Sequence, residues 1–199
     1  MEDIYTAINS FKEGKSPGHD GLTIEWYETV WYLIKHDFHQ MVIEVLNNRK
    51  MSASQYRGII TLLYKNGDRN LLKNWRPITL LNVDYKIIAK CFASRLKNIL
   101  PNIIHTDQKG YVQGRYISEA NRHIQDVIRY VDDTDDEGII IFLDQTKAFD
   151  RVEWDWIDQC LQKMQFGVRF RSWIQMMLHG SKAVIKTNGY VSKFFSLSR

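Results

Sequence analysis

The stretch IIIFLDQTKAFDR, Ile139–Arg151, decides how the rest of the chain is interpreted. Its short apolar run, which ends at Leu143, predicts a buried strand that stops at Asp144. A carboxylate at the end of a buried strand is costly unless a partner compensates its charge. That partner is either a divalent metal ion of the kind used in phosphoryl transfer or a local cap or ion pair. This stretch alone leaves both interpretations open.

Length and composition indicate a folded globular chain. It has 199 residues, of which 44% are hydrophobic and 13% aromatic, enough for one core or two small lobes. No run approaches the ~18 apolar residues that a membrane span needs, and the first residues lack the apolar core of a signal peptide. Cys91 and Cys160 form neither a metal-ligand spacing nor a disulfide framework, which favours a reducing compartment.

Charge is distributed unevenly along the sequence. The net charge is +4, yet residues 126–158 carry 11 acids and three bases, whereas the remainder carries 24 bases and 12 acids. A basic body beside an acidic stretch fits a polyanion-binding surface next to a cation site. A generic basic protein with one solvated acidic loop explains the same distribution, so charge does not decide between them.

Apolar periodicity and turn residues predict alternating helices and strands. A short helix is expected within Met1–Lys12, and Thr23 is expected to cap a long helix whose apolar residues run from Ile24 to Val45. Further helices are predicted over Val83–Ile99, Ile117–Val131, Glu153–Phe166 and Val168–Leu178. Strands are predicted over Tyr56–Tyr64 and around Pro77, and Asn188-Gly189 predicts a hairpin between Lys182–Thr187 and Val191–Ser196.

Four separated segments resemble one family when they are taken in order. They are KSPGHDG (Lys15–Gly21), NWRPITLLNVDYKIIAK (Asn74–Lys90), DQKGYVQGRYISEAN (Asp107–Asn121) and FLDQTKAFDRVEW (Phe142–Trp154). Together they resemble the reverse transcriptases of non-LTR (LINE-type) retrotransposons: a segment before the fingers, two fingers motifs and motif A of the palm. A group II intron maturase is a weaker alternative, because the first two segments are closer to the LINE type.

The resemblance implies a fold and an activity. The expected fold class is α+β, with the fingers of a right-hand polymerase and an incomplete palm in one domain, 1–199. Its parts would be a helical extension of the fingers (1–55), the fingers (56–130) and the first part of the palm (131–199). The implied activity is RNA-directed DNA synthesis with an RNA template, a DNA primer, dNTPs and Mg²⁺. No membrane partner is expected, protein partners are unknown, and the location would be the nucleus or the cytoplasm.

The same resemblance implies roles for individual residues. Asp144 would be the catalytic carboxylate that binds metal, and the backbone carbonyl of Gln145 would help to hold the nucleotide-side ion. Phe149 would pack under the incoming sugar, and Arg76 would contact the triphosphate of the dNTP. The residues expected to approach the template are Gln108, Gly110, Gly114 and Arg115. Taken singly, several have an ordinary alternative: a surface ion pair for Arg76, turns for the two glycines, and core packing for Phe149.

Two further acidic patterns are interpreted as structural. Asp150 and Glu153 have the spacing of a capping box at the start of a helix, so Asp150 is not expected to be a second metal ligand. Tyr130–Asp133, YVDD, mimics the second metal motif of the family. It precedes motif A, however, and continues into polar residues, so it is expected to be a solvated helix end and turn.

The resemblance also leads to an expectation about completeness. In the family the final hairpin runs into a segment like Gln-Gly-Cys-Pro-Leu-Ser and then into the second metal motif, and neither is found in these 199 residues. Since two-metal catalysis needs carboxylates from both motifs, the chain alone is expected to be inactive. The alternative from another class is a non-catalytic nucleic-acid-binding remnant of a retrotransposon.

Overall fold

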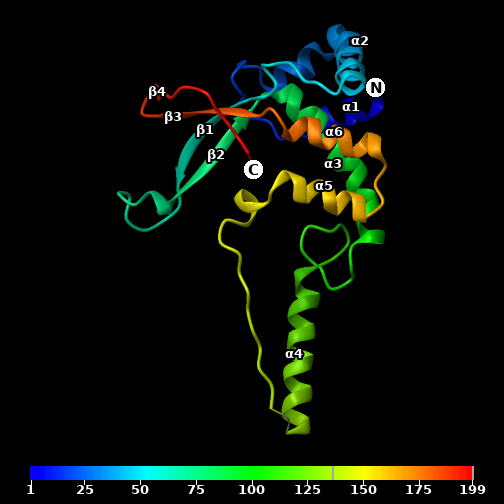
Figure 1. Cartoon of the computed structure of the whole chain (residues 1–199), viewed down its shortest axis with the longest axis vertical. Coiled ribbons are helices and arrows are strands. Elements are labelled where there is room, and N and C mark those ends of the chain that lie inside the picture. Colours follow the sequence, from blue (N-terminus) through cyan, green and yellow to red (C-terminus); the bar gives the residue numbers. More distant parts are fainter. Residues whose placement is uncertain (136, 199) are drawn as a thin grey trace. The chain divides into compact units, whose positions relative to one another are not determined.

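The computed structural model describes residues 1–135 and 137–198. It divides into two compact units, the first formed by Met1–Cys91 with Val152–Arg199 and the second by Phe92–Arg151. Within the described residues the chain forms six α-helices and five strands, so the mixed α and β composition that the sequence predicts is confirmed (Figure 1). None of the helices in these ranges is long and apolar enough to cross a membrane.

The first unit contains a mixed sheet in which β1 (Arg57–Tyr64) is central. It pairs antiparallel with β2 (Trp75–Leu81) and parallel with β3 (Lys182–Thr187). On its other side β3 pairs with two short strands, β4 (Tyr190–Val191) and β5 (Phe195–Ser196). β1, β2 and β3 agree with the sequence prediction, whereas the predicted strand Val191–Ser196 is divided into β4 and β5 by residues 192–194, which are in no regular structure.

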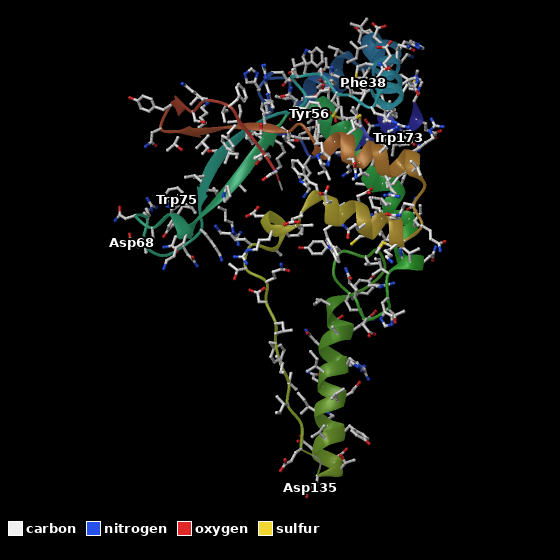
Figure 2. The ribbon with its side chains drawn as sticks, viewed as in Figure 1. Phe38, Tyr56, Asp68, Trp75, Asp135 and Trp173 are labelled. Atoms are coloured by element: carbon white, nitrogen blue, oxygen red, sulfur yellow. The ribbon has the colours of Figure 1, made fainter. Side chains whose placement is uncertain are left out.

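Two turns of this sheet follow directly from local sequence. Between β3 and β4, Asn188 and Gly189 have φ values of 50° and 83°, the left-handed pair that a two-residue hairpin requires. The longer connection from β1 to β2 contains a 3₁₀ turn, η1 (Leu72–Asn74). Figure 2 labels Asp68 and Trp75 at this end of the sheet. The Trp75 indole donates to the carbonyl of Arg69 at 2.9 Å, and the Asn74 amide donates to the carbonyl of Asp68 at 2.8 Å.

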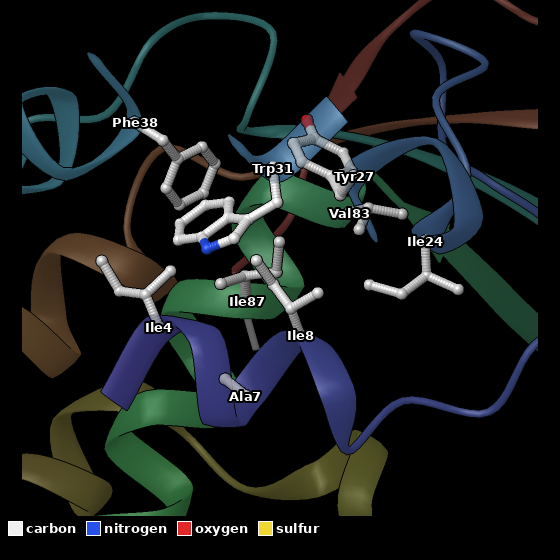
Figure 3. Packing of buried hydrophobic residues seen from close by; sticks show 9 residues of the cluster. All are labelled: Ile4, Ala7, Ile8, Ile24, Tyr27, Trp31, Phe38, Val83 and Ile87. Carbon is white, nitrogen blue, oxygen red and sulfur yellow. The ribbon is translucent and has the colours of Figure 1, made fainter. Parts of the chain in front are cut away.

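The core of the first unit lies between α1 (Glu2–Asn9), α2 (Ile24–Asn48) and the start of α3 (Val83–Ile103). Figure 3 shows its nine side chains turned toward one another from these three helices. Ile8 and Ile87 are completely buried, and the rings of Trp31 and Phe38 meet at 5.8 Å. The Thr23 hydroxyl accepts a hydrogen bond from the backbone N–H of Trp26, which confirms the predicted N-cap of α2.

Helix α6 (Val168–Leu178) is attached to this body by three side chains that donate to backbone carbonyls. The Trp173 indole donates to Leu46 of α2 at 3.0 Å. The Tyr56 hydroxyl, just before β1, donates to Met176 at 2.9 Å, and the Tyr85 hydroxyl of α3 donates to Met177 at 3.1 Å. Helix α5 (Trp154–Lys163) joins α6 through a two-pronged ion pair between Asp158 and Arg171, which holds the pKa of Asp158 below its usual value.

A buried asparagine joins the segment 15–21 to the rest of the first unit. Asn82 is 1% exposed at the junction of β2 and α3. Its amide donates to the Ser54 hydroxyl at 3.0 Å, and its side-chain oxygen accepts from the Asp20 backbone at 3.4 Å. A methyl group added at Gly18 would lie 2.3 Å from the Asn82 backbone nitrogen. The glycine therefore lets the turn approach this junction closely.

The second unit contains the end of α3, a loop over residues 104–116, and α4 (Ile117–Thr134). Residues 137–145 form an extended segment without regular structure, which leads to the 3₁₀ turn η2 (Ala148–Arg151) (Figure 1). Tyr130–Asp133 lies in the last turns of α4, and Asp135 caps the helix with a φ of 53°. The expectation that YVDD is a solvated helix end is therefore confirmed, while Asp136, in the predicted turn, lies outside the described residues.

The predicted buried strand at Ile139–Leu143 is wrong. These five residues are in no regular structure and are between 50% and 92% exposed. The reason is the absence of a ladder partner, because no strand is described within residues 92–151. An extended segment without a neighbouring strand cannot satisfy its backbone groups inside a core, and its backbone remains in water.

The predicted capping box at Asp150 and Glu153 is also wrong. Helix α5 begins at Trp154 with Glu153 at the N-cap, and no side chain makes a cap hydrogen bond there. Asp150 belongs instead to η2, where its backbone N–H donates to the carbonyl of Lys147 at 3.0 Å. Asp150, which the Asp150–Glu153 spacing placed at the start of the helix, is therefore part of the 3₁₀ turn that precedes it.

Candidate active site

Asp144 and Gln145 lie on the extended segment of the second unit, and both side chains are exposed. A carboxylate and a backbone carbonyl are hard oxygen donors, the kind of ligand that Mg²⁺ prefers. The donor types therefore fit a magnesium ion, and water or a nucleotide could complete its coordination. Across residues 1–135 and 137–198, no three His, Cys, Asp or Glu side chains converge into a metal cluster.

Phe149 presents an exposed aromatic face in the same unit. It lies in η2, is 81% exposed, and meets the ring of Tyr111 edge to face at 6.2 Å and 86°. The alternative that Phe149 is ordinary core is therefore wrong. Sequence reasoning assigned no role to Tyr111, which is 92% exposed with a φ of 61°. The available signal was an aromatic residue between glycines in GYVQG.

The 104–116 loop exposes three of the four residues expected to approach a template. Gln108, Gly110 and Gly114 are on the surface, and a methyl group added at either glycine would meet no atom within 4 Å. Gly114 has a φ of 78°, which explains a glycine at that position. Gly110 has neither a positive φ nor a crowded environment, so the folded chain itself does not require a glycine there.

The fourth residue, Arg115, points inward. Its two terminal guanidinium nitrogens donate to four backbone carbonyls at the end of α3 and in the loop, at 2.5 to 2.9 Å. Sequence reasoning grouped Arg115 with the exposed template residues. In the structure its guanidinium instead binds the main chain of its own unit.

Arg76 belongs to the first unit, where it is exposed on β2 opposite Leu63 of β1. Directly paired strand residues project to the same face of a sheet, and side chains alternate along each strand. The register therefore places Arg57, Lys182 and Lys186 on the same face as Arg76. We call these four residues the basic sheet face. The guanidinium of Arg57 also lies over the ring of Phe194 at 5.1 Å.

A cavity of about 550 Å³ lies elsewhere in the first unit, between the start of α5 and strands β3 and β5. Its lining includes Glu153, Trp154, His179, Lys182 and Ser196. Lys182 is shared with the basic sheet face, but none of the residues predicted from sequence lines this cavity. Apart from Arg115, the residues predicted from sequence are exposed on the unit to which each belongs.

One partly buried carboxylate lies in the first unit away from these residues. Asp84, in the first turn of α3, borders a small cavity with Tyr27 and Phe38. Burial raises the pKa of Asp84, although its hydrogen bonds with the Tyr85 backbone, at 2.7 Å, and with Gln55 oppose this effect. Burial also raises the pKa of Tyr27, and the nearby charge of Asp84 adds to the increase.

Comparison with known proteins identifies the family. Residues 63–197 match the family described as reverse transcriptase (RNA-dependent DNA polymerase). This range contains the second, third and fourth of the segments whose order suggested the resemblance. The chain belongs to the reverse transcriptase family.

The similar proteins are encoded by retrotransposons. Over 94% of its length the chain is 37% identical to the transposon TX1 uncharacterized 149 kDa protein of Xenopus laevis. It is 26% identical to a putative 115 kDa protein of the element R1DM of Drosophila melanogaster, over 94% of the chain, and to a Pol polyprotein of the element R2 of Popillia japonica, over 93%. The resemblance to non-LTR retrotransposon proteins is confirmed. The chain spans 14%, 18% and 25% of these relatives.

Proposed function

We propose that the chain forms the nucleotide-binding and template-binding part of an RNA-directed DNA polymerase. The observation that supports this most strongly is the family match over residues 63–197, a range that contains Arg76, the 104–116 loop and Asp144 to Phe149. In the reaction the primer 3′-oxygen attacks the α-phosphorus of a dNTP, and pyrophosphate leaves. We further propose the division into a helical extension (1–55), fingers (56–130) and the first part of the palm (131–199).

The proposed roles follow from the chemistry of each side chain. Asp144, with the Gln145 carbonyl, would hold Mg²⁺, which supplies neutralisation of the triphosphate charge when it is bound. Arg76 would offer its planar guanidinium to the triphosphate from the basic sheet face. Phe149 is exposed in the second unit, and its ring would support the sugar of the incoming dNTP.

The template would be approached through the 104–116 loop, where Gln108, Gly110 and Gly114 are exposed and open. A strand that comes close to the backbone is a physical reason for a glycine at position 110. An RNA template paired with a DNA primer is the substrate that the family implies. We also propose that the chain acts in the nucleus or the cytoplasm, as expected of proteins that copy retrotransposon RNA.

The proposal is tested with two variants, each of which removes one negative charge from a different aspartate. Asp144→Asn removes the proposed metal-binding carboxylate, and Asp150→Asn makes the same change six residues later in η2. RNA-templated incorporation of a dNMP on a DNA primer is measured with the protein that is expressed from the whole open reading frame encoding this chain. Asp144→Asn is expected to lower the rate roughly 10³-fold, because metal binding contributes several kcal/mol. Asp150→Asn should change it little.

Binding to the primer–template, measured in parallel, separates the two functional classes. It should survive Asp144→Asn, because basic side chains supply most of the affinity for nucleic acid. Equal losses of incorporation in both variants would contradict the role of Asp144. Binding without incorporation by the unmodified protein would favour the non-catalytic nucleic-acid-binding alternative.

A further inference from the structure

The guanidinium of Arg115 is enclosed by carbonyl oxygens from the end of α3 and from the 104–116 loop. Nη2 donates to Pro101 at 2.9 Å and to Ile104 at 2.8 Å, while Nη1 donates to Gln108 at 2.9 Å and to His105 at 2.5 Å. Arg115 itself is only partly exposed. The side chain thus joins the last turn of α3 to both ends of the residue 104–108 turn.

These four bonds use the atoms that a phosphate would need. The two terminal nitrogens of a guanidinium carry four N–H donors, and two-pronged recognition of a phosphate requires at least one of these nitrogens. Here each of the two already donates to two carbonyls. The last carbonyls of a helix otherwise lack partners, and a cation is favoured at that end of the helix dipole. A direct contact between Arg115 and a template phosphate would therefore sacrifice bonds that hold α3 and the loop.

A second basic residue of the loop is also engaged inside the unit. The Lys109 ammonium meets the carboxylate of Glu119, in the first turn of α4, at 2.8 Å, and the lysine side chain is 22% exposed. Arg115 and Lys109 thus attach the loop to the helices on either side of it. Between these attachments the loop presents open backbone at Gly110 and the ring of Tyr111, and the exposed side-chain amide of Gln108 directly precedes Lys109.

We propose that Arg115 is a positioning residue, which holds the 104–116 loop in shape so that its neutral groups meet the template while its own charge stays on the main chain of α3 and the loop. This inference rests on the proposed function for its template. It makes Arg115 essential for a different reason from the one that the family resemblance implies. The loop would engage the strand through amide, backbone and ring contacts, and phosphate charge would be met elsewhere, as on the basic sheet face.

The test combines amide hydrogen exchange with the salt dependence of binding, for the whole chain and an RNA–DNA primer–template. Arg115→Gln should lower protection in residues 104–116 and leave the α1–α2 core unchanged. Affinity should fall at every salt concentration. The slope of log K against log salt should stay that of the unmodified chain, because no phosphate contact is lost. A direct phosphate contact predicts the opposite: unchanged protection and a slope reduced by about 0.7–0.9.

Two more variants keep the result decisive. Arg115→Lys can place one ammonium among the carbonyls and should keep more protection than Arg115→Gln. This graded loss shows that the hydrogen bonds of residue 115 hold the loop, whereas general unfolding of the Gln variant would not show it. Arg122→Gln, on α4, removes an exposed arginine whose ion pair with Asp126 is 3.9 Å long, and should leave the loop protected. Unchanged protection in Arg115→Gln, or loss of protection throughout both units, would overturn the positioning role. If the unmodified chain binds no primer–template, the proposed function fails, and hydrogen exchange still decides whether Arg115 holds the loop.

Discussion

The α1–α2–α3 core of the first unit and the Ile139–Leu143 segment of the second both contain large apolar side chains but differ in the burial of those side chains. In the core, isoleucines such as Ile8 and Ile87 are fully buried among aromatic rings from α2. In the segment, Ile139 and Leu143 are each about nine-tenths exposed. A helix satisfies its own backbone and needs only an apolar neighbour, whereas a strand needs a hydrogen-bonded neighbour before it can be buried. Apolar composition therefore predicts burial only where the partner is present.

The largest expected effect contrasts one isoleucine from each region. Ile87→Ala should lower the free energy of unfolding by about 2–5 kcal/mol, because it leaves a cavity among side chains that pack on all sides. Ile141 is 74% exposed, so Ile141→Ala should lower the free energy of unfolding by less than about 0.5 kcal/mol. Urea unfolding followed by far-UV circular dichroism measures both units. Similar losses for the two variants would mean that the segment is packed in solution.

A glycine from each unit tests the second contrast. Gly18→Ala should destabilise the first unit by about 1–3 kcal/mol, because the added methyl would lie 2.3 Å from backbone and side-chain atoms of Asn82. Gly110→Ala meets no atom within 4 Å and should leave stability nearly unchanged. If it also weakens primer–template binding, the open space at Gly110 is used by the ligand. Equal stability of both variants in urea would show that the turn at Gly18 is loose.

Helix N-termini offer a third contrast of smaller size. Thr23 caps α2 through its hydroxyl, whereas Tyr116 at the start of α4 makes no side-chain cap bond although its backbone is extended, with φ −120° and ψ 137°. Thr23→Ala should cost about 1 kcal/mol, and Tyr116→Asp should stabilise α4 by a similar amount. Amide exchange of the first turns of α2 and α4 measures each change locally. Greater fraying of α4 in Tyr116→Asp would refute this prediction.

The smallest effect concerns pH and the partly buried Asp84. Because burial raises its pKa in the folded state, the folded chain binds more protons than the unfolded chain between the ordinary and the raised value. Stability should therefore fall as pH rises through that window and recover as pH falls. Asp84→Asn, which keeps the shape and removes the charge, should flatten this part of the pH profile and stabilise the chain at neutral pH. A profile identical to that of the unmodified chain would contradict this account.

Local features were the most predictable part of the fold. The cap at Thr23, the Asn188-Gly189 hairpin and the helix end at Tyr130–Asp133 follow from backbone preferences within a few neighbouring residues, and the structure confirms all three. The capping box at Asp150 was wrong because the 3₁₀ turn η2 precedes α5, and the spacing of two acids does not register such a turn. The spacing of two acidic residues shows that a capping box is possible, but it does not show whether those residues form a helix start or a 3₁₀ turn.

The candidate site was predictable in its residues and less so in their contacts. Family order identified the segments around Arg76, Gln108 and Asp144, and the matched range 63–197 includes all of them. It did not reveal that Tyr111 meets Phe149, nor that Arg115 faces backbone carbonyls. Those contacts join residues that are distant in sequence, or depend on where a helix ends, and a pattern of residue types contains neither kind of information.

The sequence by itself determined the family and the positions of the helices and of β1 to β3, because motif spacing, apolar periodicity and turn residues act within short windows. Only the tertiary structure decided which apolar residues are buried, that Asn82 joins three segments, and that the charge of Arg115 is directed at its own main chain. The physical reason is the same in each case. Burial and hydrogen bonding each require two groups in contact, and the fold decides which group of the chain becomes the partner of a given residue.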